Sequence, residues 1–425
     1  MRVRLAYGRH GLDIDVPERN CDVVEPVYHP GLPDEHAALL EVLRHPMGMP
    51  PLHETVKSTD TVAITVCDIT RPIPTDRILP PILEELAHVP REQIVILIAS
   101  GSHRANTRPE LEEMLGREVV QDYRVVNHTA FDKETLRYVG DTSTGIPIRL
   151  NRLWLDADVR VATGLVEPHF FAGFSGGPKV PAIGLAGIDT ILGEHSAYLV
   201  GHPRSTWGVI DDNPMHTVIR EIARRTGVDF NLNVIVNREH RIVRAYAGDL
   251  WASHKAACQE ARRIVMRPVP EPYDIVITTN SGYPLDLNLY QTIKGMSAAA
   301  LIVRAGGVII CASECSDGIP EHGEYKRLLA SVSSPEEFLK VIRRPDHHPV
   351  MDQWEVQLQA QVQMKATVYL KSSLPDDDAR AAHMLPISSV EEALKTALEQ
   401  MGDDARICVL PEGPQTIPYV DEKAA

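Results

Sequence analysis

A repeated pattern of apolar strand, polar loop and helix constrains this chain more than any other feature. Apolar runs typical of buried strands occur at 61–68, 93–100 and 157–164. Each is followed by a loop rich in Gly, Ser, Thr or Pro, and helical stretches separate the runs. Continuous apolar strands separated by helices indicate a mostly parallel sheet with helices on its faces. The sequence therefore predicts an α/β fold.

Helix signals support this interpretation. Thr107 and Glu110 have capping-box spacing, and Gly116 suits the end of the same helix. The segment 76–89 has helical periodicity but contains two adjacent prolines. Because proline lacks the N–H that a helix interior needs, we expect this helix to be kinked or to start late.

A second α/β unit is expected after a proline-rich segment at 267–273, which is typical of a linker. The predicted domains are therefore 1–268 and 272–425. Before the boundary we expect an antiparallel pair, 229–236 with 240–248, and a helix at 250–266. After it, 273–303 suggests a strand, a polar loop and a helix, and further strands are expected at 306–313, 365–372 and 405–413.

Composition limits the class of protein. The chain has 425 residues, 44% hydrophobic and 24% charged, as in ordinary globular proteins. Its net charge of -15 argues against nucleic-acid or anionic-membrane binding. No signal peptide or membrane-spanning run is evident, so we expect a cytoplasmic protein. The six cysteines are scattered along the chain and indicate no disulfide framework. Cys311 and Cys315 do not have the spacing of a metal site. We interpret this pair instead as small residues at the end of a buried strand.

Polar side chains follow three of the predicted strands. Asp68, Thr70 and Arg71 come after the first strand, His103 after the second and His169 after the third. In parallel sheets, ligands bind beyond the carboxyl ends of the strands. A carboxylate, a guanidinium and two imidazoles are therefore expected at one edge of the sheet, and imidazoles suit acid/base work near neutral pH.

The stretch HFFAGFSGGPK, residues 169–179, suggests a phosphate-binding loop. It approximates a Walker A motif, but Pro178 removes a backbone donor and Val180 replaces the magnesium-binding hydroxyl. A P-loop NTPase is therefore disfavoured, and no G-x-G-x-x-G supports ordinary NAD binding. Lys179 has apolar neighbours, so it is either a desolvated, nucleophilic amine that attaches a cofactor or substrate, or a solvated loop lysine.

Three further positions are chemical candidates. His195 follows a helical stretch and is either a metal ligand or a structural histidine. Gln291 and Lys294 are three residues apart, which places them on one face of a helix. Lys294 and Arg71 would suit a substrate carboxylate, with Arg71 offering two parallel hydrogen bonds; the alternative for the Gln291–Lys294 pair is a solvated helix face.

Five motifs in fixed order resemble the lactate racemase family. They are DITRP at 68–72, SGSHR at 100–104, HFFAGFSGGPK at 169–179, His195 sixteen positions after Lys179, and GYPLDLNLYQTIKGM at 282–296. The resemblance extends from about residue 60 to the last predicted strand.

The resemblance implies a two-domain α/β enzyme with its active site in the cleft between the domains. It also implies nickel and a nickel-pincer nucleotide, a pyridinium-3-thioamide-5-thiocarboxylate mononucleotide whose sulfur arms and ring carbon bind nickel. By the same resemblance, Lys179 forms the thioamide, His195 ligates nickel, and His103 and His169 are the acid/base groups. Other residues are implied beside the cofactor (Asp68, Thr70, Ser175, Gly176, Gly177) or the substrate (Arg71, Tyr290, Gln291, Lys294, Trp354).

The implied activity is an isomerase that racemises a small 2-hydroxy acid, lactate-like or malate, by reversible hydride transfer from Cα to the tethered cofactor. Cofactor-synthesising enzymes are the implied partners. One alternative is a C2-epimerase of sugar acids. Another is a non-catalytic paralogue that binds the nucleotide or nickel, although a carrier would not need both His103 and His169. Arg204 is either a ligand for a second substrate carboxylate, which would favour malate, or an exposed loop arginine. The other candidate pocket residues are Phe170, Phe171, Tyr198 and Trp207.

Overall fold

The computed structural model describes residues 1–321 and 323–421, which form two compact units. The first 27 residues group with the C-terminal part of the chain, as does a short segment around residue 200, and the domain bounds 1–268 and 272–425 stay a prediction. Unit 1 comprises Met1–Val27, Ser196–Pro203 and Val265–Ala425, and unit 2 comprises Tyr28–His195 and Arg204–Ile264.

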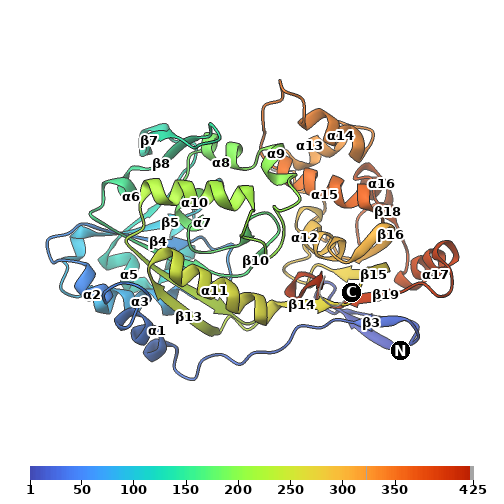
Figure 1. Ribbon diagram of the computed structural model, residues 1–425, viewed down its shortest axis with the longest axis horizontal. Coiled ribbons are helices and arrows are strands. Elements are labelled where there is room, and N and C mark those ends of the chain that lie inside the picture. The colour runs from blue at the N-terminus through green and yellow to red at the C-terminus, as the bar shows by residue number, and fades with distance from the viewer. Residues whose placement is uncertain (322, 422–425) are drawn as a thin grey trace. The chain divides into compact units, whose positions relative to one another are not determined.

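Unit 2 contains a six-stranded sheet in the order β13-β12-β9-β4-β5-β6. Figure 1 labels β13, β4 and β5 of this sheet. All neighbours are parallel except β12 and β13, which form the predicted antiparallel pair. Strands β4, β5, β9 and β12 lie where the apolar runs predicted them, whereas β6 was not predicted. The bounds are β4 Val62–Cys67, β5 Ile94–Ala99, β6 Arg124–Asn127, β9 Val159–Leu165, β12 Phe230–Val236 and β13 Ile242–Gly248.

Helices of unit 2 precede, connect and follow these strands. The capping box of Thr107 and Glu110 begins α4, which ends at Gly116 with a φ of 85°. The helices are α1 Glu35–Arg44, α2 Leu52–Thr55, α3 Thr75–Glu85, α4 Arg108–Leu115, α5 Arg117–Asp122, α6 Arg152–Asp156, α7 Lys179–Gly184, α8 Ile188–Glu194, α10 Pro214–Thr226 and α11 Leu250–Val265. Two small hairpins complete the unit: β7 Leu136–Asp141 with β8 Pro147–Asn151, and β10 Pro168–His169 with β11 Gly173–Phe174.

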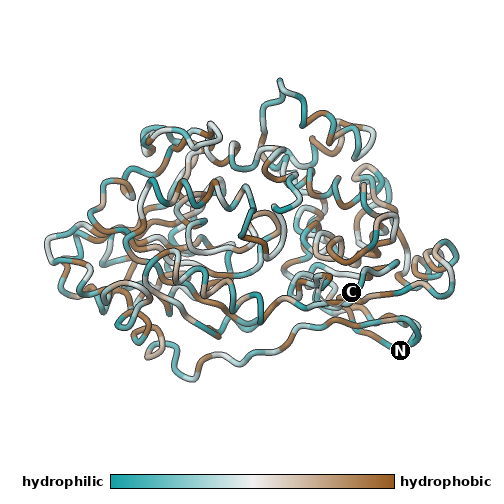
Figure 2. Tube along the Cα trace, in the orientation of Figure 1, coloured by the Kyte–Doolittle hydropathy of each residue, from teal (hydrophilic) through white to brown (hydrophobic). Residues whose placement is uncertain are grey.

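Unit 1 contains a second six-stranded sheet, in the order β18-β17-β16-β15-β19-β3, with every neighbouring pair parallel. Most residues of its central strands are buried, and Figure 2 colours the chain by hydropathy, with apolar residues in brown. The bounds are β3 Cys21–Val23, β15 Tyr273–Thr279, β16 Val303–Ala312, β17 Ala366–Lys371, β18 Leu385–Pro386 and β19 Ile407–Leu410.

The remaining elements of unit 1 flank this sheet. An N-terminal hairpin is formed by β1 Arg2–Leu5 and β2 Leu12–Asp15, and β14 Met266–Val269 pairs with β20 Ile417–Val420. The helices are α9 Ala197–Val200, α12 Leu289–Ala300, α13 Tyr325–Ala330, α14 Pro335–Ile342, α15 Gln353–Lys365, α16 Asp376–Ala381 and α17 Val390–Met401. The predicted α/β class is confirmed, with two mainly parallel sheets flanked by helices.

One local prediction was wrong, and one of the two alternatives of another is excluded. The segment 267–273 is not a plain linker, because β14 pairs in parallel with β20, a partner about 150 residues away that the local pattern does not reveal. Helix α3 does not start late, since it begins at Thr75 and contains both Pro80 and Pro81. Its buried apolar side chains, including Ile78, Leu79 and Ile82, outweigh the cost of the two prolines.

Candidate active site

Asp68 and His103 meet at the ends of the neighbouring strands β4 and β5. His103 Nδ1 lies 2.8 Å from Asp68 Oδ2, and the Thr70 hydroxyl donates to Asp68 Oδ1 over 2.8 Å. Burial alone would raise the pKa of Asp68, but the hydrogen bonds from His103 and Thr70 and the charge of Arg71 lower it overall. The ionised carboxylate keeps the His103 proton on Nδ1, so a neutral His103 has its lone pair on Nε2, as a general base requires.

His169 lies on β10, beyond the end of β9. The backbone N–H groups of Phe171 and Ala172 both donate to its Nδ1 over 3.2 Å. Its ring stacks on that of Phe170 with centroids 4.5 Å apart. Because Nδ1 accepts, a neutral His169 has its proton on Nε2. The two candidate acid/base histidines therefore have opposite tautomers, since one has a carboxylate and the other two donors at Nδ1.

Lys179 is the first residue of α7. Burial and the nearby positive charge of Arg71 lower the pKa of its amine to about 8. A sizeable fraction of the amine is then neutral and nucleophilic slightly above neutral pH. This environment favours the desolvated lysine over the solvated loop lysine that the sequence left open.

His195 follows α8, and the ring of Phe171 lies edge-on to it with centroids 6.4 Å apart. Its Nδ1 donates to the carbonyl of Ile191 over 2.8 Å, which places the lone pair on Nε2, the nitrogen suited to a metal. Burial lowers the pKa of His195 to about 4. Within residues 1–321 and 323–421, no three His, Cys, Asp or Glu side chains gather as a metal cluster.

Glu194 precedes His195 and was not among the predicted site residues. It is 0% exposed, and in the described part of the chain neither carboxylate oxygen has a hydrogen-bond partner. Burial raises the pKa of Glu194 well above its usual value. A buried polar group without a partner is costly in a folded protein. This unsatisfied carboxyl next to His195 indicates capacity for a polar ligand.

The glycine-rich loop is built to a tight backbone path. Gly177 has a φ of 46°, and an added Cβ there would lie 2.4 Å from the ring of His254. Its N–H donates to Asn233 Oδ1, and the Ser175 hydroxyl donates to the carbonyl of Leu165. Gly176 also has a positive φ, 72°. Gly176 and Gly177 therefore allow a backbone turn and a close contact that a larger residue would prevent. Contact of Ser175, Gly176 or Gly177 with a nucleotide stays a prediction.

In unit 1, α12 carries three of the predicted substrate-side residues. Lys294 Nζ donates to Gln291 Oε1 over 2.7 Å, which confirms that the two side chains share a helix face. The indole N–H of Trp354, on α15, donates to the Tyr290 hydroxyl over 3.3 Å. Tyr290, Gln291, Lys294 and Trp354 therefore form two hydrogen-bonded pairs on neighbouring helices.

Glu355 lies beside this group and was missed by the sequence analysis. It is 1% exposed, and burial raises its pKa to about 8 although the charge of Lys294 opposes the shift. Apolar residues at every second position from Trp354 to Val362 are typical of a strand, yet this segment forms α15. Because α15 is buried on most of its surface, no apolar stripe marks the helix or singles out Glu355.

The Glu355→Gln variant should change how stability depends on pH. Since the pKa in the folded state is raised above its usual value, the protonated carboxyl stabilises the fold at low pH and that contribution is lost as pH rises towards 8. We expect the variant to gain several kcal/mol relative to the parent between pH 5 and 8, since one pKa unit corresponds to about 1.4 kcal/mol. Urea unfolding across this range measures the difference. The exposed Glu399→Gln on α17 is the control, and a parallel pH trend in both variants would contradict the assignment.

Other predicted pocket residues have mixed environments. Phe171 is 1% exposed and belongs to the core, whereas Tyr198 is 70% exposed. Trp207 is buried, with its ring centroid 5.6 Å from that of Phe170. Arg204 is exposed and donates to the carbonyl of Asp211, so its proposed role at a second carboxylate stays untested.

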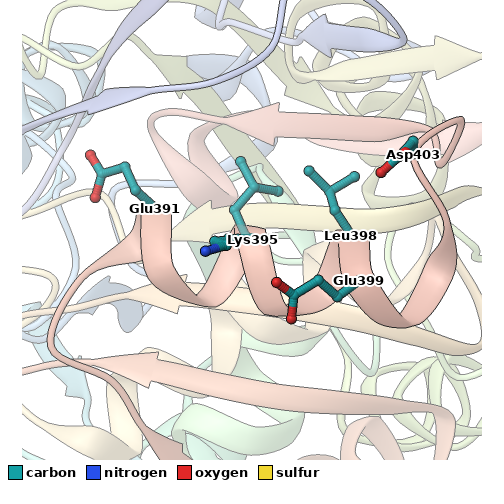
Figure 3. Close-up of a pocket in the computed structure, with 6 residues that line it drawn as sticks. Glu391, Lys395, Leu398, Glu399 and Asp403 are labelled. Carbon is teal, nitrogen blue, oxygen red and sulfur yellow. The ribbon is translucent and has the colours of Figure 1, made fainter.

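A surface hollow on α17 is lined by none of the predicted site residues (Figure 3). It is lined by Leu394 and Leu398 together with charged side chains that include Glu391 and Lys395. We assign it no role. Among the described residues, no helix is long and apolar enough to cross a membrane.

Comparison with known proteins gives the same family as the motifs. Residues 7–208 match the lactate racemase N-terminal domain, and residues 269–417 match the lactate racemase C-terminal domain. The chain is 32% identical over 421 residues to lactate racemase of Thermoanaerobacterium thermosaccharolyticum, covering 98% of both chains. It is 34% identical over 389 residues to lactate racemase of Lactiplantibacillus plantarum, covering 91% of both.

The solved structures agree. The lactate racemase apoprotein of Thermoanaerobacterium thermosaccharolyticum superposes with a TM-score of 0.92 and 31% identity, over 99% of this chain and 100% of that one. A Thermotoga maritima protein shares the fold. It superposes with a TM-score of 0.68 and 19% identity, over 93% of this chain and 100% of that one. The chain therefore belongs to the lactate racemase family.

Proposed function

We propose that this protein inverts C2 of a small 2-hydroxy acid, lactate-like or malate, with His103 and His169 as acid/base groups. The observation that carries the proposal is the pair formed by Asp68 and His103 at adjacent strand ends. The carboxylate orients the imidazole, leaves its Nε2 able to take a proton and stabilises the imidazolium that results. Family membership and the names of the two lactate racemases support the substrate class.

A lysine-tethered nickel-pincer nucleotide fits the residues present. Lys179 has a pKa of about 8, as attack on an acyl carbon requires, and His195 is neutral with its lone pair on Nε2. The buried carboxyl of Glu194, which has no hydrogen-bond partner among the described residues, could bind a polar group of the cofactor. When bound, the cofactor would supply a reversible hydride acceptor for Cα. We propose Lys179 as its tether and His195 as the protein ligand of nickel.

The chain's own residues would then move the hydroxyl proton. His103 Nε2 takes it, and Asp68 holds the ring in the required tautomer. His169 presents its N–H to the substrate oxygen on the other side, and inversion needs such a group at each face. We further propose that Arg71 and Lys294 bind the carboxylate, with Gln291 orienting Lys294 and with Tyr290 and Trp354 shaping the substrate side.

A substrate panel tests this function. The protein, produced together with cofactor-synthesising enzymes, is given single enantiomers of lactate and malate, and gluconate as a sugar acid, and the products are separated by chiral chromatography. We expect interconversion of the enantiomers of lactate or malate. Conversion of gluconate alone would instead show a C2-epimerase of sugar acids. Failure to convert any of them by protein whose Lys179 adduct is verified by mass would contradict the proposal.

A further inference from the structure

Two buried histidines lie directly behind the glycine-rich loop. His216 on α10 donates from Nδ1 to the carbonyl of Ala172 over 3.2 Å. His254 on α11 donates from Nε2 to the carbonyl of Ser175 over 3.0 Å. Their rings stack with centroids 5.9 Å apart and an interplanar angle of 14°. We propose that His216 and His254 are positioning residues that hold the loop in the geometry that His169 and Lys179 need.

Both histidines are fixed in one protonation state. They are 3% and 4% exposed, and burial lowers the pKa of His216 to about 3 and that of His254 to about 4. Each ring therefore carries one proton near neutral pH, and that proton lies on the nitrogen that faces the loop carbonyl. Their role is to donate at a fixed point, so they differ from His103 and His169, which are proposed to exchange protons.

The carbonyls of Ala172 and Ser175, which the two histidines hold, lie close in sequence to His169 and Lys179. The anchored Ala172 carbonyl belongs to the peptide unit that directly follows the Ala172 N–H, and that N–H is one of the two groups that donate to His169 Nδ1. Ser175 precedes the glycine pair that leads to Lys179. The ring of His254 also fills the space where a side chain on Gly177 would lie.

Regular secondary structure contributes little to this loop. Its hairpin, β10 with β11, contains only two residue pairs. Two backbone bonds join it to its surroundings, from Ser175 N–H to the Glu167 carbonyl and from Gly208 N–H to the Gly173 carbonyl. Side chains add further bonds: Asn213 Nδ2 donates to the carbonyl of Phe171 over 2.8 Å, and Gly177 N–H donates to Asn233 Oδ1 over 3.0 Å. Because the loop conformation depends on side-chain hydrogen bonds, loss of one buried donor should loosen it.

Isosteric pairs of variants test the proposal. His254→Gln keeps a donor near the Nε2 position, whereas His254→Phe keeps a ring without a donor; His216→Asn and His216→Phe form the equivalent pair at Nδ1. Leu43→Ala, in the core of unit 2 on α1, reports the effect of lost stability alone. Circular dichroism and thermal unfolding confirm that each variant folds.

The first readout needs no cofactor, so it is independent of the proposed function on which the inference rests. Amide hydrogen exchange of the peptide covering 171–177 should accelerate about tenfold or more in either Phe variant and no more than about twofold in the Gln and Asn variants. Equal exchange in the Phe variants and the parent would overturn the proposal. Exchange of this peptide that accelerates as much in Leu43→Ala as in the Phe variants would also overturn the proposal.

The second readout is the fraction of Lys179 that carries the adduct when the protein is made with the cofactor-synthesising enzymes. We expect this fraction to fall at least about threefold in His254→Phe and to recover in His254→Gln. Full loading of His254→Phe would contradict the link to Lys179. A parent protein without adduct would count against the proposed function, while the exchange result would still decide whether the two histidines hold the loop.

Discussion

Replacing His103 or His169 by Ala should lower racemisation by about 10²- to 10⁴-fold, the usual contribution of a positioned acid/base group. His103 has the stronger structural support, because buried Asp68 orients its ring over 2.8 Å. His169 is held instead by two backbone N–H groups. Rates measured from each single enantiomer, in both directions, provide the test.

The adduct on Lys179 should persist in both histidine variants, because neither histidine is proposed to take part in tethering. Intact mass therefore separates a lost proton-transfer group from a lost cofactor. His10→Ala, at an exposed site in unit 1, is the matched control and should keep the parent's rate. Full activity in either His103→Ala or His169→Ala would exclude the mechanism with two histidines.

Lys179→Met should abolish both adduct and racemisation, because the thioether has no nucleophilic nitrogen. It should also stabilise the protein without cofactor by about 1 to 3 kcal/mol at pH 7, since a partly buried cation is replaced by an apolar chain of similar length. Thermal unfolding and intact mass measure the two effects. Lys57→Met, at an exposed position of unit 2, should change neither.

The stability gain should depend on pH in a defined direction. The Lys179 pKa is lowered from 10.5 to about 8, so between these values the unfolded chain binds more protons than the folded one. Stability of the parent therefore rises with pH in this window, and the advantage of Lys179→Met shrinks as pH increases from 8 to 10. A constant advantage across that range would show that the Lys179 amine is not desolvated.

Lys179 and Glu355 share one physical feature, namely that burial shifts the pKa of each in favour of its neutral form. For Lys179 the neutral form is the nucleophile. For Glu355 the neutral form leaves the charge of Lys294 less compensated, which suits the binding of a substrate carboxylate.

Local sequence patterns determined the α/β class, strands β4, β5, β9 and β12 of unit 2 and the strand-end placement of Asp68 and His103. These features follow from continuous apolar runs and from the rule that parallel strands present their carboxyl ends at one edge. The pairing of Gln291 with Lys294 also followed from helical spacing. The motifs further identified the family, because their order along the chain is independent of packing.

Only the tertiary structure decided the features that depend on distant partners. Three such features could not be predicted from local patterns. They are the pairing of β14 with β20, the grouping of the first 27 residues with the C-terminal part, and the helical state of α15. The burial of Glu194, Glu355, His216 and His254 is likewise invisible in sequence. A residue's neighbours along the chain determine its local conformation, whereas its pKa and hydrogen-bond partners depend on which remote segments exclude water around it.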